Sequence, residues 1–166
     1  MNKKYVAVCT AVVVAIVLCI VIAVFTKPEK EEKTPVTDVS ENVKMDAHEG
    51  SYSLKITAVY DTAPDTDEPN PPEAERVAVV VYEYTNEDIS SGLSIGNTHF
   101  KAYDKNGKEL EQFSQKGLFE VGEAGQSDTY TASVAFALNN DENYIKVEFY
   151  NDTASKKPDA VFEKEW

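Results

Sequence analysis

Cysteine and histidine are scarce in this 166-residue chain, which holds only two of each. Cys9 and Cys19 both lie within the first 25 residues, so the remaining sequence can form neither a disulfide nor a thiolate zinc site. His48 and His99 are also too few, and too far apart in sequence, to suggest a zinc site. A disulfide-stabilised domain is therefore excluded, and a zinc protein is disfavoured.

Basic residues are also few, since 16 Lys and Arg stand against 29 Asp and Glu, for a formal net charge of −13. The excess of acid is larger in the main part of the chain, because no acidic residue precedes Glu29 and three lysines do. Proteins bind nucleic-acid phosphates with clustered Lys and Arg. We therefore expect no nucleic-acid partner.

A long apolar run stands near the N-terminus. The 21 residues from Tyr5 to Phe25 carry no charge, and as a helix they would span about 31 Å, enough to cross a membrane. Phe25 occupies a position where a signal-peptide cleavage site needs a small residue, so an uncleaved anchor is favoured over a removed signal peptide. Lipid attachment at Cys19 is disfavoured because Leu18 precedes it. The sequence predicts a transmembrane helix over residues 1–25 with the N-terminus inside.

The segment from Thr26 to Ala47 is rich in charge, contains Pro28 and Pro35, and has only isolated apolar side chains. Such a composition cannot bury enough apolar surface to fold by itself. We expect residues 26–47 to form an extended tether between the membrane anchor and an extracytoplasmic domain over residues 48–166.

From Gly50 onward, apolar residues alternate with polar ones, as in strands with one buried face. Residues 51–60 form the first such run, and residues 76–86 are rich in β-branched and aromatic residues on both faces, which predicts a central strand. Asn106-Gly107 separates two short runs and predicts a tight primed turn. Further strands are expected early in the segment 117–128 and at 128–138, 143–150 and 159–166.

These runs predict an all-β fold, an antiparallel immunoglobulin-like β-sandwich of about seven strands. No segment after residue 50 has a helical period of useful length. The predicted core consists of apolar residues within the strand-like runs: Leu54, Ile56, Val79, Val81, Tyr82, Phe100, Val134, Phe136, Ile145, Val147 and Phe149.

Three stretches carry a family resemblance: VAVVVYEYTNEDISSG, THFKAYDKNGKELEQ and GEAGQSDTYTASVAFAL. With a strand ending at Thr85-Asn86, an Asn-Gly turn and a later strand ending in Phe136-Ala137-Leu138, the chain resembles uncharacterised immunoglobulin-like domains of Gram-positive lipoproteins and membrane-anchored surface proteins. The resemblance covers about residues 50 to 150. It implies a sandwich outside the cell, and it transfers no catalytic residue.

Few residue patterns suggest a catalytic, carbohydrate-binding or metal-binding site. Gly92-Leu93-Ser94-Ile95-Gly96 matches the G-x-S-x-G motif of a nucleophile elbow. Such an elbow lies between a strand of a parallel sheet and a helix, and neither is expected here, so the two glycines are interpreted as loop residues without a catalytic role. The aromatic residues recur at strand spacing, which favours packing over carbohydrate stacking. A weak candidate calcium site is offered by four carboxylates in and before a proline-rich connection: Asp61, Asp65, Asp67 and Glu68.

The sequence thus favours a single-pass bacterial membrane protein with a non-enzymatic binding module outside the cell, and a protein or cell-envelope ligand as its partner. No cofactor is expected apart from the weak calcium site. Two alternatives remain open: an envelope enzyme or enzyme accessory acting on wall polymers, which a cleft with converging carboxylates would favour, and a structural spacer without a ligand.

Overall fold

The computed structural model describes Thr34, residues 36–38 and residues 40–166. The predicted anchor and the first part of the predicted tether lie outside these residues. Within the described part of the chain, no helix is both long and apolar enough to cross a membrane.

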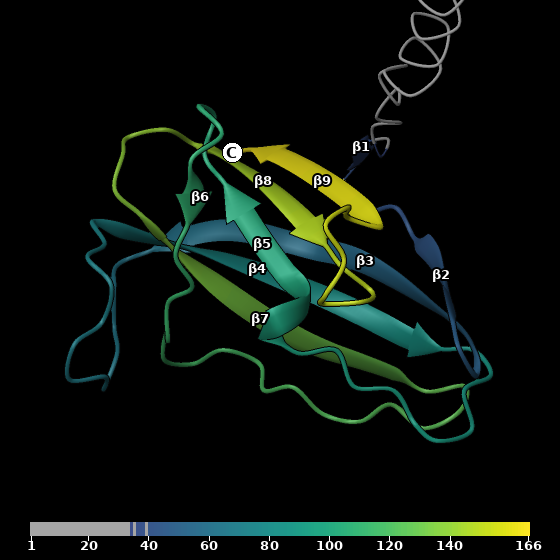
Figure 1. Ribbon diagram of the computed structural model, residues 1–166. Helices are drawn as coiled ribbons and strands as arrows, with labels where there is room; N and C mark the ends of the chain where they lie inside the picture. Colours follow the sequence, from purple (N-terminus) through teal and green to yellow (C-terminus); the bar gives the residue numbers. More distant parts are fainter. Residues whose placement is uncertain (1–33, 35, 39) are drawn as a thin grey trace, which may run out of the picture. The chain divides into compact units, whose positions relative to one another are not determined.

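Nine strands of the described chain form two sheets, and its only helical element is a three-residue 3-10 turn, η1 (Asn97–His99) (Figure 1). One sheet has the strand order β1-β9-β8-β5-β6 and the other has the order β2-β3-β4-β7. Neighbours run antiparallel except β1 and β9, which are parallel. The bounds are β1 Val36–Asp38, β2 Val43–Ala47, β3 Gly50–Thr62, β4 Arg76–Asn86, β5 Phe100–Tyr103, β6 Glu109–Leu110, β7 Thr129–Leu138, β8 Tyr144–Phe149 and β9 Ala160–Glu165.

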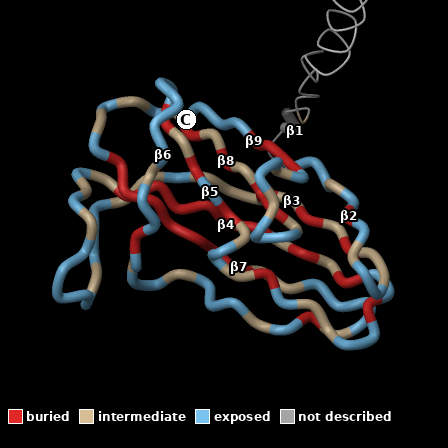
Figure 2. The backbone as a smooth tube through the Cα atoms, in the orientation of Figure 1, coloured by how far each residue is buried: buried red, intermediate tan, exposed pale blue. Residues whose placement is uncertain are grey.

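The main core lies between the two sheets, where buried residues from both gather (Figure 2). Tyr82 of β4 packs against Phe100 of β5 with ring centroids 4.5 Å apart, and Phe100 packs against Phe149 of β8 at 5.3 Å. The first of these tilted aromatic contacts joins the two sheets, and the second lies between neighbouring strands of one sheet. All eleven predicted core residues are buried, nine of them in this core, whereas Val79 and Val81 belong to a second cluster. The all-β prediction is confirmed by the two sheets.

A second apolar cluster covers the outer face of the four-stranded sheet. Val77 and Val79 of β4 pack there with Ala135 of β7, beneath Phe113 from the connection between β6 and β7. Phe113 is 4% exposed, and its N–H donates to the Ala135 carbonyl at 2.9 Å. Because both of its faces are buried, β4 is the interior strand that its continuous apolar run predicts.

Polar contacts hold two connections together over this second cluster. The Lys116 N–H donates to the Asp65 carbonyl at 2.8 Å, and its ammonium lies 2.8 Å from an Asp67 carboxylate oxygen. Gln115 adds two bonds, accepting from the Asp65 N–H and donating to the Ala63 carbonyl. The proline-rich connection between β3 and β4 is thereby fastened to the connection that contains Phe113.

Three predictions need correction. The tether was expected to reach Ala47, but β1 and β2 lie within it and Met45 is only 5% exposed, so the folded unit begins at Thr34. Its apolar residues are sparse, and strand pairing with β9 and β3 orders them. The strand expected soon after Gly117 is irregular chain. The third correction, to the turn at Asn106-Gly107, is described with the site below.

Candidate functional site

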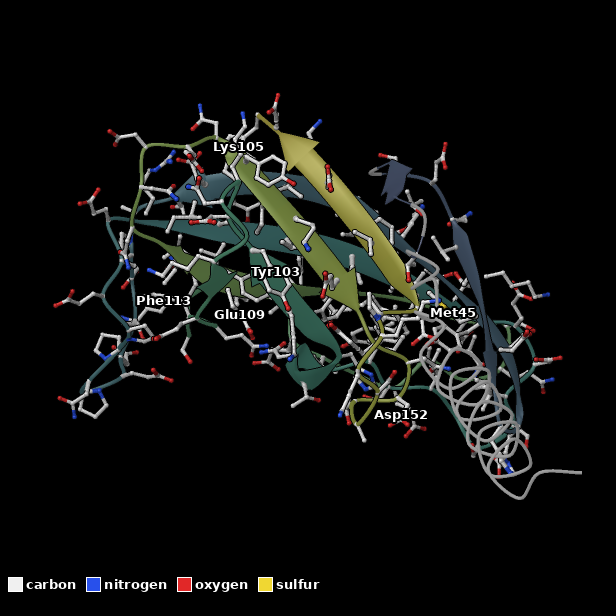
Figure 3. The ribbon with its side chains drawn as sticks, turned by 45° about the horizontal axis from the view of Figure 1, so that its top comes forward. Met45, Tyr103, Lys105, Glu109, Phe113 and Asp152 are labelled. Carbon is white, nitrogen blue, oxygen red and sulfur yellow. The ribbon has the colours of Figure 1, made fainter. Side chains whose placement is uncertain are left out.

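A groove of about 420 Å³ opens at one end of the sandwich, between the hairpin formed by β5 and β6 and the end of β7. Three exposed carboxylates line it: Glu109 and Glu111 from the hairpin side and Glu73 from the β3–β4 connection. Lys108 adds one ammonium group. In Figure 3, Glu109 lies beside Tyr103, its partner in the β5–β6 register. Negative charge therefore dominates the groove.

Amides and a small apolar area complete the lining. Asn106 contributes from the hairpin, and Asn139 and Asn140 contribute from the turn that follows β7. Leu110 and Ala137 supply apolar surface between them. Carboxamides both donate and accept hydrogen bonds, so the groove offers donors, acceptors and negative charge around a small apolar area.

Asp104 stabilises the turn between β5 and β6, which forms one side of the groove. Its Oδ1 accepts hydrogen bonds from the N–H groups of Asn106 and Lys108, both at 2.9 Å, and its carbonyl accepts one from the Gly107 N–H at 3.0 Å. Gly107 has a φ of 80°, whereas neither Lys105 nor Asn106 has a positive φ. The predicted primed turn is therefore wrong, because its central positions require positive φ. The carboxylate of Asp104 stabilises instead a turn over Lys105 and Asn106, followed by a left-handed glycine.

Arg76, the chain's only arginine, shapes the wall on the other side. Its guanidinium donates to the carbonyls of Asn140 and Glu142, both at 2.9 Å, and so fixes the turn between β7 and β8. The same group pairs with Asp61 at 2.9 Å, and Asp61 accepts a hydrogen bond from the Trp166 indole at 3.1 Å. One side-chain network thus holds the groove wall, the start of β4 and the last residue of the chain.

A separate polar network lies on the outer face of the five-stranded sheet. Glu148 accepts hydrogen bonds from Lys146 at 2.8 Å and from the Tyr150 hydroxyl at 2.7 Å. Burial opposes the ionisation of Glu148, but hydrogen bonds from Lys146 and Tyr150 outweigh it and lower the pKa of the carboxyl. Lys146 also lies 4.3 Å from the ring centroid of Tyr103, and Lys101 lies 5.7 Å from that of Tyr150. These two rings are engaged by lysines of the same chain.

The nucleophile-elbow letters fall in an irregular connection. Ser94 lies between β4 and β5, and the chain continues through η1 into a strand, without the helix that an elbow needs. The Nδ1 atom of His99 lies 2.8 Å from the Tyr150 carbonyl, so this nitrogen donates a hydrogen bond to the backbone. The geometry supports the interpretation of Gly92 and Gly96 as loop residues and not as part of a nucleophile elbow.

The four carboxylates of the predicted calcium site are Asp61, Asp65, Asp67 and Glu68. Asp61 belongs to the Arg76 network, whereas Asp65 and Asp67 flank Lys116 at 3.3 and 2.8 Å. Glu68 accepts a hydrogen bond from the Ser114 hydroxyl. Among the described residues, no three or more His, Cys, Asp or Glu side chains are grouped so that they could hold a metal ion. In the structure these carboxylates therefore form ion pairs and hydrogen bonds with other parts of the chain.

No protein-family model matches the chain, and no curated protein sequence matches it. Solved structures do share its fold. MPT63, a secreted protein of Mycobacterium tuberculosis, aligns with a TM-score of 0.58 and 12% identity over 81% of this chain and 100% of its own. YjhA of Bacillus subtilis aligns with a TM-score of 0.54 and 10% identity over 78% of this chain and 98% of its own.

A candidate lipoprotein of Bacillus subtilis, YcdA, aligns with a TM-score of 0.56 and 12% identity over 75% of this chain. The alignment spans only 38% of YcdA, so this chain corresponds to a part of that protein. At these identities the comparisons establish a shared β-sandwich fold.

The groove was not found from the sequence. Glu73, Asn106 and Asn139 come from three different connections, and connections carry no periodic pattern. The single arginine of this acidic chain could have indicated one wall of the groove. A guanidinium that is substantially buried needs acceptors around it, so Arg76 marks a place where several polar groups meet. Arg76 finds four: carboxylate, side-chain amide and two backbone carbonyl oxygens.

Proposed function

We propose that this chain is a membrane-tethered, immunoglobulin-like binding module outside a bacterial cell, and that the groove beside the β5–β6 hairpin takes a cell-envelope ligand without catalysis. The observation that carries the proposal is the groove itself, a concave surface of about 420 Å³ lined by amides and carboxylates. Ligand sites are concave and place a few polar groups against apolar surface.

Two observations support the location. The apolar run from Tyr5 to Phe25 is long enough to cross a membrane, and two proteins of the same fold are described as a secreted protein and a candidate lipoprotein. Because the folded unit begins at Thr34, only eight residues separate it from the run. Fully extended, this segment reaches about 30 Å. A module so tethered would meet ligands close to the membrane.

The chemistry of the groove favours a ligand with amino and hydroxyl groups. Glu73, Glu109 and Glu111 accept hydrogen bonds and attract positive charge, and the amides of Asn106 and Asn139 can bond hydroxyl groups. The acidic charge of the chain disfavours anionic polymers. Among envelope components, peptidoglycan carries both amino and hydroxyl groups.

Co-sedimentation with purified peptidoglycan, stripped of anionic polymers, tests this function. We expect the full-length protein in detergent to sediment with the polymer, and Asn139→Ala with Glu109→Gln to reduce the bound fraction severalfold. Glu120→Gln is the matched control, because Glu120 is an exposed carboxylate outside the groove. Binding that is absent, or that is equally strong in the groove variant, would refute the assignment.

An envelope hydrolase is the second candidate, since three exposed carboxylates line one groove. Glycoside hydrolysis uses a pair of carboxyl groups, one on either side of the scissile bond. Release of soluble fragments from peptidoglycan, abolished in Glu109→Gln or Glu111→Gln, would support the enzyme. Binding without release would favour the module.

A further inference from the structure

We propose that Asn106 is the site at which this domain deamidates, and that Asp104 restrains the reaction by holding the turn closed. The conversion is a covalent modification of a residue that lines the groove. It needs no enzyme and no co-reactant other than water.

The sequence and the turn single out Asn106. Asn106 is exposed, and it is the only asparagine in the chain that is followed by glycine. Glycine has no side chain to hinder attack by its own backbone nitrogen. A Cβ built at Gly107 would have no heavy atom within 4 Å outside the neighbouring residues, so no other part of the described chain crowds the attacking residue.

The reaction takes place within the Asn106-Gly107 pair. The backbone nitrogen of Gly107 attacks Cγ of Asn106, so an N–Cγ bond forms while the Cγ–Nδ2 bond breaks. The amide proton of Gly107 leaves with the side-chain nitrogen as ammonia. Water then opens the imide at either carbonyl, which yields aspartate or isoaspartate at position 106.

The turn opposes this attack. The Gly107 N–H is engaged with the Asp104 carbonyl at 3.0 Å, and the Asn106 N–H is engaged with the Asp104 carboxylate at 2.9 Å. A third bond, from the Lys108 N–H to the same carboxylate, closes the turn from the other side. Asp104 is only 7% exposed, so water competes poorly for these bonds. The turn must open before the Gly107 nitrogen can reach Cγ.

The product would change the groove. Asn106 Nδ2 lies 3.5 Å from a Glu142 carboxylate oxygen, and deamidation replaces this donor with a further negative charge. Isoaspartate also lengthens the backbone of the hairpin by one carbon. The effect on a ligand rests on the proposed function, whereas the modification itself does not.

The test follows each asparagine by mass spectrometry during incubation of the full-length protein in mildly alkaline buffer, after digestion with a glutamate-specific protease. We expect product at Asn106 before any other asparagine, formed at least about tenfold more slowly in the folded protein than in urea. Asp104→Ala should accelerate it in buffer, whereas Lys105→Ala, which removes no side-chain bond of the turn, should not.

Four results would overturn the proposal: a different asparagine reacting first in the folded protein, no product at Asn106, equal rates in buffer and in urea, or an unchanged rate in folded Asp104→Ala. If Asp104→Ala fails to fold, the comparison between buffer and urea still decides whether the folded turn restrains the reaction. Because no ligand is used, these outcomes are independent of binding in the groove.

Discussion

The side chain of Asn86 and the backbone of Ile89 form a reciprocal pair of hydrogen bonds. The Asn86 Oδ1 accepts from the Ile89 N–H at 2.8 Å, and the Asn86 Nδ2 donates to the Ile89 carbonyl at 2.9 Å and to the Ala124 carbonyl at 3.0 Å. Asn86 has no exposed surface. The last residue of β4 thus fastens two connections that run along one end of the sandwich.

We expect Asn86→Ala to lower the free energy of unfolding by about 3 kcal/mol, because it leaves the Ile89 N–H and carbonyl without their partner and removes one of the two hydrogen bonds to the Ala124 carbonyl. Urea unfolding followed by circular dichroism measures the change. Asn97→Ala is the control, since Asn97 is exposed, and it should cost less than about 0.5 kcal/mol. Equal effects would show that the Asn86 bonds contribute little.

Gly122 is required by close packing. A Cβ at this position would lie 2.2 Å from Cζ of the Tyr130 ring, and the Gly122 carbonyl accepts a hydrogen bond from the Tyr84 hydroxyl. Gly122→Ala should therefore cost about 1–3 kcal/mol through overpacking. Gly96→Ala should be nearly neutral, because a Cβ there meets no atom within 4 Å and Gly96 has an extended backbone. Thermal unfolding of the two variants compares them directly.

The second apolar cluster makes a separable contribution to stability. Phe113→Ala removes a ring that is 4% exposed, and it should cost about 3 kcal/mol or more and speed amide exchange in residues 111–119. Phe119→Ala removes a ring that is 56% exposed on the same connection, and we expect it to change stability by less than about 0.5 kcal/mol. Similar losses in both variants would contradict the assignment of Phe113 as the residue that covers this face.

Buried tyrosines should make the domain sensitive to alkali. Burial raises the pKa of Tyr52 and of Tyr82 above their usual range, and each hydroxyl is hydrogen-bonded, to Asn151 and to the Ile95 carbonyl. A raised pKa in the native state means that stability is complete below about pH 10 and falls above it, by up to about 1.4 kcal/mol per pH unit for each tyrosine.

Unfolding in urea between neutral pH and pH values above about 10 checks this slope. Tyr82→Phe should make it shallower, because one buried titrating group is removed. Tyr60→Phe should leave it unchanged, since Tyr60 is 47% exposed. A slope that is the same in the wild type and in Tyr82→Phe would refute the explanation.

The sequence predicted the strands that are apolar on both faces and those in which apolar and polar residues alternate. The bounds of β4 were predicted to the residue, because Pro71 and Pro72 precede it and its run of valines and tyrosines admits few alternatives. β1 and β2 were missed because Val36, Val43 and Met45 stand among charges. The partner of β2 is β3, which directly follows it, whereas β1 is ordered by pairing with β9 at the other end of the domain. Local pattern cannot report pairing with a strand more than a hundred residues away.

The site was less predictable than the fold. Carboxylate spacing suggested calcium near Asp65 and Asp67, but Lys116, about fifty residues later, occupies the position between them. Asn139 enters the groove because the turn that contains it is fixed by Arg76. Both contacts depend on which connections meet at a sheet end, and the sequence pattern does not encode that.

The most direct test of the account is protease treatment of intact protoplasts that express the full-length chain in a Gram-positive host, followed by detection with an antibody to the sandwich. We predict that protease removes the domain from intact protoplasts, and that without protease the chain stays with membranes through carbonate extraction. Protection of the domain in intact protoplasts, or a mature N-terminus beyond Phe25 in the medium, would contradict a tethered module outside the cell.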